Sequence, residues 1–540
     1  MSPDPREREA DVLIVGAGAS GGVVAKRLAS AGVSVLCLEQ GDWVAPSEFP
    51  GERREFDALI TQRWHPDPNR RGLDADYPID VSASDVPPTM FNAVGGSTLL
   101  YNGSWPRMLP SDFRVRSLDG VADDWPLAYE DLAPYYRQVE RDFSVSGLAG
   151  DPAYPPHEAF PLPPLPLGPF GRAAARGMNA KGWHWWPHPT AIASRAQGHL
   201  AACVRLGTCM AGCPRGAKAS TDLTHWRDAI AAGARLVTGA RVREVTLDSR
   251  GRAEGAVYVD RDGVEHHPRA RVVVLAANGV GTARLLLLSR SGAHPDGLAN
   301  SSGLVGKRLM MHPPSSVVGV YEEDLEAWIG PAGPPVVSME FAESDERRGF
   351  PRGAKWDAFP VAGLHSHLER LADRPFEERF GPAYHANLKR LIGHAFDWDI
   401  LVEDLPLESN RVLLSDDLRD GDGIPAPRVE YRLSDDTRAN LDFQIARATE
   451  AHEAGGATET FVSDWYPIQG WHLLGTARCG EDPATSVVNG YGEAHDAANL
   501  FVVDGSVFVT SSAVNPTATI CAFALRAADH ILSRSPHFQG

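Results

Sequence analysis

The chain has 540 residues, of which 43% are hydrophobic and 23% are charged. This composition is typical of folded globular domains and excludes a disordered or collagen-like protein, and the length suggests more than one hydrophobic core. Acidic residues outnumber basic ones by 70 to 52, giving a net charge of -18, so nucleic acid is not an expected partner. The polar segment 1–10 lacks the plan of a signal peptide and no apolar run is long enough to span a membrane, so we expect a cytoplasmic protein.

Residues 11–38 show the first regular pattern: an apolar run, a glycine-containing turn, a helical stretch that ends near Gly32, and a second apolar run. This order predicts a strand, a helix and a second, parallel strand. Two more apolar blocks, 271–277 and 500–504, are each followed by a glycine and a helical pattern. Because all four runs are continuously apolar, we expect them in one doubly wound parallel sheet that is covered on both faces.

The rest of the chain has a different texture. The proline-rich segment 151–170 is expected to be an extended connector, because proline disfavours helices and central strands. Residues 412–433 alternate around the turn-forming DGDG at 420–423, which predicts two antiparallel strands. Ser434 can cap a following helix, which Gly455 and Gly456 can end. These features predict a mixed second domain inserted into the first.

A GxGxxG motif, formed by Gly16, Gly18 and Gly21, lies between the first strand and its helix. In this context Gly16 allows the tight turn, Gly18 lets the backbone approach a pyrophosphate, and Gly21 lets helix and strand pack closely. Glu39, at the end of the second strand, can accept hydrogen bonds from a ribose 2′-hydroxyl. The motif predicts a dinucleotide site but does not choose between FAD and NAD, so a nicotinamide-dependent dehydrogenase stays an alternative.

Four further segments resemble blocks of the glucose-methanol-choline (GMC) oxidoreductase family. They are NAVGGSTLLYNGSWPRM at 92–108, NSSGLVGKRLMMHP at 300–313, WHLLGTARCG at 471–480, and the segment 499–531, which is similar to the family's C-terminal signature. The blocks occur in the family's order, so the resemblance covers nearly the whole chain. It implies an α/β protein with a Rossmann-like FAD-binding domain, discontinuous in sequence, and an inserted α+β substrate domain built on an antiparallel sheet.

The resemblance also implies a reaction, in which an alcohol carbon gives a hydride to N5 of FAD while a side-chain base takes the hydroxyl proton. His472 holds the position of that base and Asn515 that of its partner. Near neutrality a histidine can be unprotonated and accept a proton, and an asparagine can hydrogen-bond the alcohol oxygen without competing for it. We expect a helix with Pro516 at its first position, whose positive end would point at the flavin. The other residues expected to contact FAD are Gly95, Gly96, Ser97, Asn102, Val242, Asp504, Gly505, Asn515, Pro516 and Thr517.

The same resemblance divides the chain into two domains. The FAD-binding domain would comprise residues 1–105, 200–312 and 475–540, and the substrate-binding domain with its connectors residues 106–199 and 313–474. Leu100 lies near the position where some relatives carry the histidine that attaches FAD covalently. Leucine offers no nucleophile, so we expect non-covalent FAD. His225, in the motif THW, superficially resembles an attachment histidine but lies in a different block.

Three cysteines, Cys203, Cys209 and Cys213, resemble a bacterial ferredoxin run in which Leu206 replaces the second cysteine. Three thiolates could hold a three-iron cluster, so an electron-transferring dehydrogenase subunit is a second alternative. We favour structural thiols or a local disulfide and no metal site.

The expected function is FAD-dependent oxidation of a primary or secondary alcohol. An asparagine partner is compatible with the sugar- and sterol-oxidising members of the family, and a sugar, polyol or amino-sugar hydroxyl is favoured. The sequence does not identify the electron acceptor, which is oxygen, a quinone or a protein.

Overall fold

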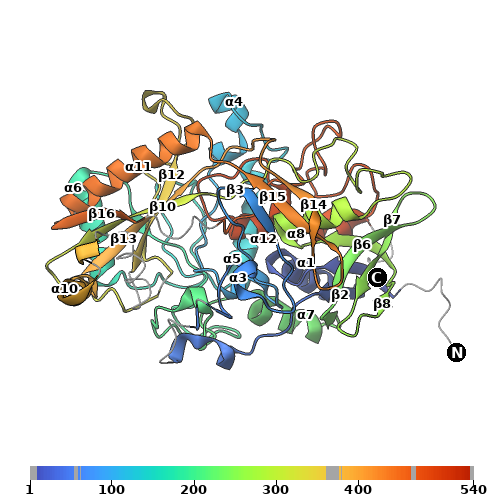
Figure 1. The fold of residues 1–540 in the computed structure, drawn as a ribbon, viewed down its shortest axis with the longest axis horizontal. Helices are drawn as coiled ribbons and strands as arrows, with labels where there is room; N and C mark the ends of the chain where they lie inside the picture. The colour runs from blue at the N-terminus through green and yellow to red at the C-terminus, as the bar shows by residue number, and fades with distance from the viewer. Residues whose placement is uncertain are drawn as a thin grey trace.

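A computed structural model describes residues 9–53, 59–60, 62–331, 333–360, 376–378, 380–463 and 470–534 (Figure 1). Residues 1–8, on which the expectation about a signal peptide rests in part, lie outside these ranges. Within the described ranges, no helix is both long enough and apolar enough to cross a bilayer. The described residues form a mixed α/β fold with a parallel sheet and separate antiparallel sheets.

The parallel sheet has five strands in the order β17-β9-β1-β2-β5. Its strands are β1 (Ala10–Val15), β2 (Val35–Glu39), β5 (Arg235–Thr238), β9 (Ala270–Leu275) and β17 (Leu500–Val502), and every pairing is parallel. The four apolar runs in the sequence therefore form strands of one sheet, as predicted. The sequence did not predict β5, a short edge strand that begins with an exposed arginine.

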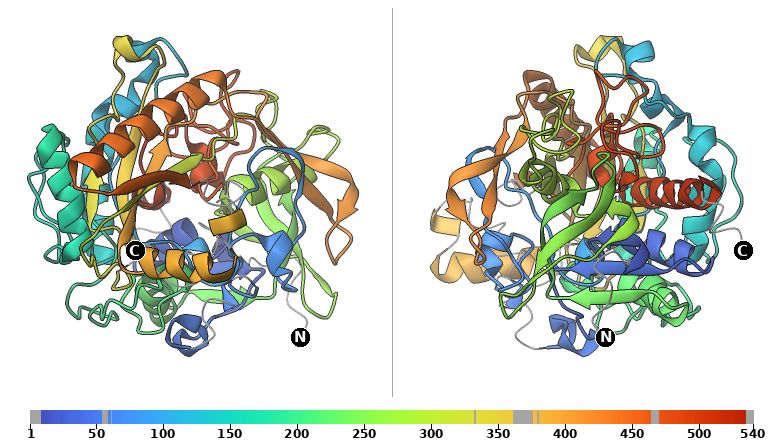
Figure 2. Two further views of the ribbon diagram at one scale, coloured as in Figure 1. Left: turned by 60° about the vertical axis from the view of Figure 1, so that its left-hand side comes forward. Right: turned by 90° about the vertical axis from the view of Figure 1, so that its right-hand side faces the viewer.

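The two faces of this sheet are covered differently. Val12 and Ile14 pack into the core that contains helices α1 (Ala19–Ala29) and α12 (Thr517–Arg534), which lie side by side (Figure 2, right). Leu13 points the opposite way, because strand side chains alternate, and packs against Ala240 and Ala256. On that face lies an antiparallel sheet of β6 (Arg241–Leu247), β7 (Ala253–Val259) and β8 (Glu265–His266). The parallel sheet is covered on both faces, as predicted. Helices α1 and α12 cover one face, and the antiparallel sheet of β6, β7 and β8 covers the other.

The second large sheet has six strands in the order β16-β10-β13-β12-β11-β4. The pairings are antiparallel between β4 (Trp186–Pro187), β10 (Pro314–Val320), β11 (Val336–Ser338), β12 (Ala354–Pro360), β13 (Ala395–Val402) and β16 (Glu459–Ser463). Helices α6 (Gly168–Lys181) and α11 (Asp435–Ala454) pack on one face, where Figure 1 shows α11 running along the sheet. The alternate side chains of β12 and β13 therefore point to the other face, toward the middle of the molecule.

The strands of the parallel sheet fall within 1–105, 200–312 and 475–540, and those of the six-stranded sheet within 106–199 and 313–474. The domain boundaries themselves stay a prediction.

The predicted hairpin forms, with β14 (Arg411–Arg419) and β15 (Pro425–Tyr431) antiparallel on either side of the turn. It does not join the six-stranded sheet, however. β15 pairs in parallel with β3 (Asp80–Ser84) to make a separate three-stranded sheet. The pairing links segments about 350 positions apart, and no local pattern could have indicated it.

The predicted helix boundaries are close to those observed. The hydroxyl of Ser434 accepts a hydrogen bond from the Thr437 amide at the start of α11, and Gly455 is its C-cap. The connector 151–170 is irregular until Gly168, where α6 begins with Pro169 in its first turn, a position that tolerates proline. The other α-helices of the described ranges are α3 (Pro68–Arg71), α4 (Val115–Asp119), α5 (Tyr129–Asp142), α7 (Arg227–Ala231), α8 (Asn278–Leu288) and α10 (Gly381–Leu391).

Candidate active site

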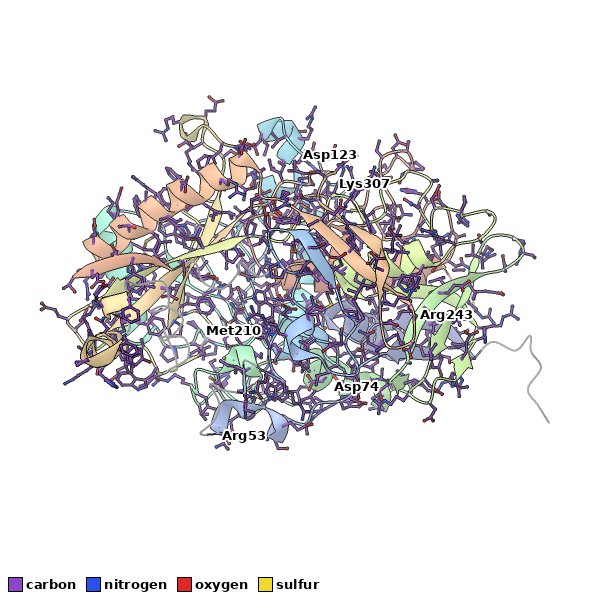
Figure 3. The ribbon with its side chains drawn as sticks, viewed as in Figure 1. Arg53, Asp74, Asp123, Met210, Arg243 and Lys307 are labelled. Carbon is purple, nitrogen blue, oxygen red and sulfur yellow. The ribbon has the colours of Figure 1, made fainter. Side chains whose placement is uncertain are left out.

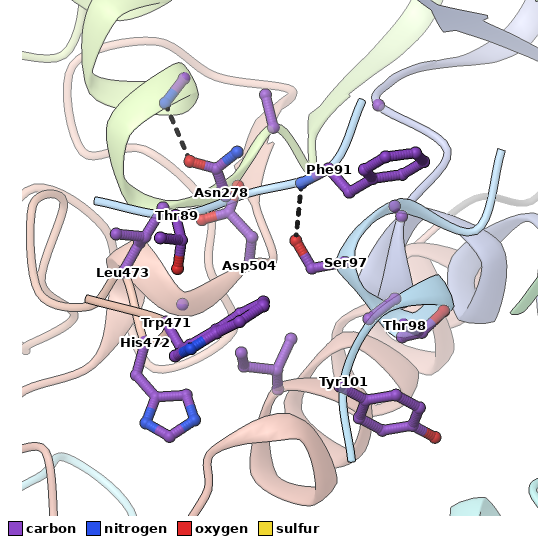
Figure 4. Close-up of a pocket in the computed structure, with 18 of the residues that line it drawn as sticks. Thr89, Phe91, Ser97, Thr98, Tyr101, Asn278, Trp471, His472, Leu473 and Asp504 are labelled. Atoms are coloured by element: carbon purple, nitrogen blue, oxygen red, sulfur yellow. Dashed lines mark hydrogen bonds between the residues drawn. The ribbon is translucent and has the colours of Figure 1, made fainter. Parts of the chain in front are cut away.

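A long cavity runs from the carboxyl ends of β1 and β2 to the inner face of the six-stranded sheet. Gly16 and Glu39 line one end, and Phe359 on β12 and Leu401 on β13 line the other. In the view of Figure 4, the Trp471 ring lies between the His472 imidazole on one side and Asp504 and Ser97 on the other. The cavity therefore has two chemically different ends.

The glycine motif shapes the first end. Gly16 has a φ of +101°, and a Cβ there would lie 2.5 Å from the carbonyl oxygen of Ala276. A Cβ on Gly21 would lie 2.0 Å from the carbonyl oxygen of Gly16, so Gly21 permits helix and strand to pack, as predicted, and does not itself line the cavity. Helix α1 begins after Gly18 with no side-chain cap and no acidic residue in its first turn. Its free amide groups therefore suit an anion such as a pyrophosphate.

Glu39 ends β2 and is held in place by backbone amides. One carboxylate oxygen accepts a hydrogen bond from Ala17 N at 2.8 Å and the other from Gly41 N at 2.9 Å. Burial raises the pKa of this carboxyl group, while the backbone hydrogen bonds lower it. Its remaining acceptor positions are available to the cavity, which Val242 lines at the same end. This arrangement fits the hydroxyl groups of a ribose.

The segment 92–108, predicted to contact the flavin, passes close to the start of α1. Gly96 sits so close that a Cβ would lie 2.9 Å from the Cα of Gly18. Ser97 accepts a hydrogen bond from Phe91 N at 3.2 Å, drawn in Figure 4. Gly96, Ser97 and Asn102 line the cavity, whereas Gly95 supplies a left-handed turn with a φ of +100° and does not.

The C-terminal signature brings a second group of predicted residues to the cavity. Asp504 follows β17 and accepts hydrogen bonds from Thr282 Oγ1 at 2.6 Å and Ser506 N at 2.9 Å. Burial raises the pKa of its carboxyl group.

Helix α12 begins at Thr517, one residue later than predicted. Pro516 precedes the helix, and its carbonyl oxygen accepts the hydrogen bond from Ile520 N. The residues of this group that line the cavity are Asp504, Gly505, Asn515, Pro516 and Thr517.

The two residues predicted to be catalytic meet in the middle of the cavity. His472 and Asn515 lie 43 positions apart in sequence, and the amide nitrogen of Asn515 is 3.5 Å from His472 Nε2. Burial, followed by the nearby His312 and Lys355, holds the pKa of His472 well below its usual value of 6.5. A neutral imidazole therefore faces the cavity at ordinary pH.

A second histidine fixes the tautomer of the first. His312 Nε2 lies 2.6 Å from the carbonyl oxygen of Ser512 and 3.1 Å from that of Ser511, so this nitrogen carries the proton. Neutral His312 must then accept at Nδ1, and His472 Nδ1 donates to it across 2.8 Å. Burial lowers the pKa of His312 to about 4, which keeps it neutral. The free lone pair of His472 is thus at Nε2, the nitrogen that faces Asn515.

The side-chain oxygen of Asn515 also has two partners. Ser104 Oγ donates to it at 2.7 Å, and the ammonium group of Lys355 donates at 2.6 Å. These contacts turn the amide nitrogen of Asn515 toward His472.

Comparison with known proteins agrees with this geometry. Two sequence models described as GMC oxidoreductase match residues 10–314 and 406–524 of the chain. The chain belongs to the GMC oxidoreductase family. It is an FAD-dependent alcohol oxidoreductase, which decides against the nicotinamide alternative.

This GMC oxidoreductase is similar to named enzymes over more than nine-tenths of their lengths. It is 41% identical to 2-methyl-1,2-propanediol dehydrogenase of Mycolicibacterium austroafricanum, over 97% of this chain and 96% of that enzyme. It is 30% identical to the fructose dehydrogenase large subunit of Gluconobacter japonicus, over 97% and 98%. It is 31% identical to paromamine 6'-oxidase of Streptomyces fradiae, over 97% and 91%.

Solved structures share the fold at low sequence identity. Formate oxidase of Aspergillus oryzae has a TM-score of 0.65 at 17% identity, covering 98% of this chain and all of that chain. Pyridoxine 4-oxidase of Mesorbium loti also has a TM-score of 0.65, at 18% identity and with the same coverage. The arrangement of the sheets is therefore that of GMC flavoproteins.

The residues of the cavity fit FAD. The uncapped amides of α1 suit its pyrophosphate, and Glu39 suits a ribose. A Cβ on Gly18 would meet no atom closer than 3.9 Å, so this glycine leaves room for a phosphate against the backbone. Leu100 lines the cavity and carries no nucleophile, whereas His225 is buried against Phe143 and is not among the lining residues.

The cysteine loop lies beside the cavity. Met210, labelled in Figure 3, lines the cavity, but the three thiols do not. Burial, with Cys209 and Cys213 nearby, raises the pKa of Cys203 to about 11. Across the described ranges, no group of three or more His, Cys, Asp or Glu residues is placed to hold a metal ion. The three-iron alternative stays a prediction.

Sequence reasoning missed three residues around the catalytic pair: Ser104, His312 and Lys355. Ser104 and His312 lie inside the family blocks at 92–108 and 300–313, so the resemblance could have drawn attention to them. Lys355 lies outside the blocks. Its signal was a lysine, one of few in this arginine-rich chain, within the apolar segment AKWDAFP.

Proposed function

We propose that this enzyme oxidises a hydroxyl group of a sugar, polyol or amino sugar, with His472 as the general base. The observation that carries the proposal is the hydrogen bond between His472 Nδ1 and His312 Nδ1, because it leaves the lone pair of His472 at Nε2, facing the cavity. A placed base of this kind contributes about 10² to 10⁴ in rate.

The side chains of the pair divide the work on the substrate. His472 Nε2 accepts the hydroxyl proton, and His312 keeps the imidazole in the tautomer that can do so. The Asn515 amide nitrogen donates a hydrogen bond to the same oxygen and stabilises the negative charge that develops there. FAD, when bound, supplies the acceptor for the hydride that leaves the alcohol carbon.

The choice of substrate class is supported by the relatives, whose names specify a diol, a ketose and an aminoglycoside. An anaerobic screen of 2-methyl-1,2-propanediol, fructose, paromamine and simple alcohols tests it, with bleaching of the flavin absorbance as the readout. Reduction by at least one polyhydroxylated compound, much faster than by simple alcohols, is expected. Fast reduction by simple alcohols alone would reject the preference.

The role of the base is tested by His472→Ala. We expect alcohol-dependent flavin reduction to fall by about 10² to 10⁴ while FAD stays bound. His199→Ala is the control, because His199 is an exposed residue that pairs with Asp228 and does not line the cavity. Rapid flavin reduction in the His472 variant would reject the assignment.

Two narrower proposals accompany the function. Because Leu100 offers no nucleophile, FAD should separate from the chain on acid denaturation, and flavin that stays attached would contradict this.

The electron-transferring alternative requires iron bound by the cysteine loop, so elemental analysis for iron and absorbance in addition to the flavin bands distinguish it from the proposed function. The cytoplasmic location stays a prediction, and the electron acceptor is to be found among oxygen, quinones and proteins.

A further inference from the structure

A buried ion pair lies directly behind the catalytic asparagine. Lys355 and Asp357 alternate with Trp356 on β12, so both side chains point to the cavity side of the six-stranded sheet. Lys355 has no exposed surface and Asp357 is 1% exposed. The Lys355 ammonium donates to Asp357 Oδ2 and to Asn515 Oδ1, the latter at 2.6 Å.

Burying two charges in a protein is costly, and a well-packed apolar pair is often as stable. Such a pair therefore points to a role beyond stability when one of its members also contacts a catalytic side chain. Lys355 is the member that does so, through the side-chain oxygen of Asn515.

Resting on the proposed function, we infer that Lys355 is a positioning residue, whose ammonium group holds the Asn515 amide in the orientation that presents its nitrogen to the reacting oxygen.

The donor and acceptor capacities of the neighbours support this assignment. Ser104 donates to Asn515 Oδ1, but its hydroxyl also lies 2.8 Å from His188 Nε2 and can act as donor or acceptor. Ser104 alone would therefore accommodate either orientation of the amide. An ammonium group has donors only, so a flipped Asn515 would place N–H groups against Lys355 and its oxygen against the lone pair of His472. Lys355 is the partner that makes the flipped orientation unfavourable.

The charge of Lys355 acts on the same site. Several titratable or charged groups lie around His472 and Asn515. They are His312 before β10, Lys355 and Asp357 on β12, His188 after β4, and Asp399 on β13, which lines the same cavity. Among these, Lys355 and His312 lower the pKa of His472, after burial. Asp357 is itself kept ionised, since Lys355 and His188 lower its pKa against the effect of burial. Neutralising Lys355 should therefore raise the pKa of His472.

The test uses the holoenzyme and the double variant Lys355→Met/Asp357→Asn, which removes the ion pair without leaving one charge buried and unpaired. Anaerobic flavin reduction should slow by about 10-fold to 100-fold, as for the loss of a hydrogen bond to a charged group. The fall should be in kcat, with KM little changed, because the Asn515 contact strengthens as charge develops. Thermal unfolding and FAD content establish that the variant is folded.

A positioning role is separated from a structural one by repeating the double variant in an Asn515→Ala background. If Lys355 acts through Asn515, the further loss there should be less than about twofold, because interacting residues are non-additive. An equal loss in both backgrounds would overturn the inference.

A titration of labelled histidine by NMR supplies a readout that does not depend on turnover. The pKa of His472 should rise in the Lys355→Gln variant, which removes the positive charge and leaves the Asp357 carboxylate in place, and an unchanged or lowered value would also overturn the inference. The proposed function fails separately, through rapid flavin reduction in His472→Ala. If the double variant Lys355→Met/Asp357→Asn does not fold, the more conservative Lys355→Gln/Asp357→Asn is measured in the same two backgrounds, because it also leaves no charge buried and unpaired.

Discussion

The two ends of the cavity are built in different ways. The nucleotide end is organised around one short βαβ unit between Gly16 and Glu39, where the backbone approaches closely and Glu39 adds a carboxylate, and Val242 lines it from another segment. The catalytic end is made of side chains from segments far apart in sequence, with 160 positions between His312 and His472 and 411 between Ser104 and Asn515. The nucleotide end suits the nucleotide part of FAD through close approach of the backbone. The catalytic end depends on hydrogen bonds between particular side chains.

This difference predicts different failures. A change at the nucleotide end should meet rigid backbone and cost cofactor binding or folding. A change at the catalytic end should leave FAD bound and reduce the rate, because the side chains there orient one another and not the nucleotide.

The largest effect is expected for Gly21→Ala. The new Cβ would lie 2.0 Å from the carbonyl oxygen of Gly16, which is backbone and cannot rotate away. We expect a loss of about 3 kcal/mol or more in stability, larger than the gain from alanine's helix propensity, together with loss of FAD. Thermal unfolding and the flavin content of the purified protein measure this.

Gly292→Ala is the matched control. Gly292 is exposed, its backbone is not left-handed, and a Cβ there would meet nothing within 4 Å. This variant should behave like the wild type. Equal behaviour of the two variants would contradict the packing role of Gly21.

At the catalytic end, His312→Phe should slow flavin reduction by about 10²-fold with FAD still bound. Phenylalanine keeps a ring in the site but removes the acceptor at Nδ1, so the tautomer of His472 is no longer fixed. Stopped-flow reduction under anaerobic conditions gives the rate. A variant that loses FAD but reduces normally when FAD is restored would contradict the separation of the two ends.

A smaller effect is expected for Glu39→Gln. The carboxylate now accepts hydrogen bonds from the Ala17 and Gly41 amides, and the NH₂ group of a glutamine would place a donor against one of these two N–H groups. FAD affinity should weaken by about 10-fold to 100-fold, while kcat at saturating FAD stays unchanged. Glu130→Gln, at an exposed position of α5, is the control for affinity measured by fluorescence titration. A fall in kcat at saturating FAD would show that the two ends are coupled.

The same contrast explains what the sequence could predict. The GxGxxG turn and Glu39 are local, and their spacing and apolar flanks carry the signal within one segment. β5 escaped prediction because an edge strand needs little apolar surface. The pairing of β15 with β3 escaped because nothing in either segment specifies a partner so far away in sequence.

For the catalytic end, the family resemblance supplied His472 and Asn515. It did not supply the hydrogen bonds that set the tautomer of His472 and the orientation of Asn515. These arise because folding brings His312, before β10, to His472 and brings Lys355, on β12, to Asn515. Ser104 and His312 lie in family blocks, and Lys355 is a lysine within a largely apolar segment, so the sequence could have drawn attention to all three residues but not to their contacts.

The most direct test of His472 as the base is the rate of anaerobic flavin reduction as a function of pH, in the wild type and in His472→Gln. Because burial lowers the pKa of His472, the wild-type rate should stay constant through neutral pH and fall only well below pH 6.5, where the imidazole gains a proton. His472→Gln should be slow at every pH and should lack that fall. The same fall at the same pH in the variant would contradict the account, because another group would then be the base.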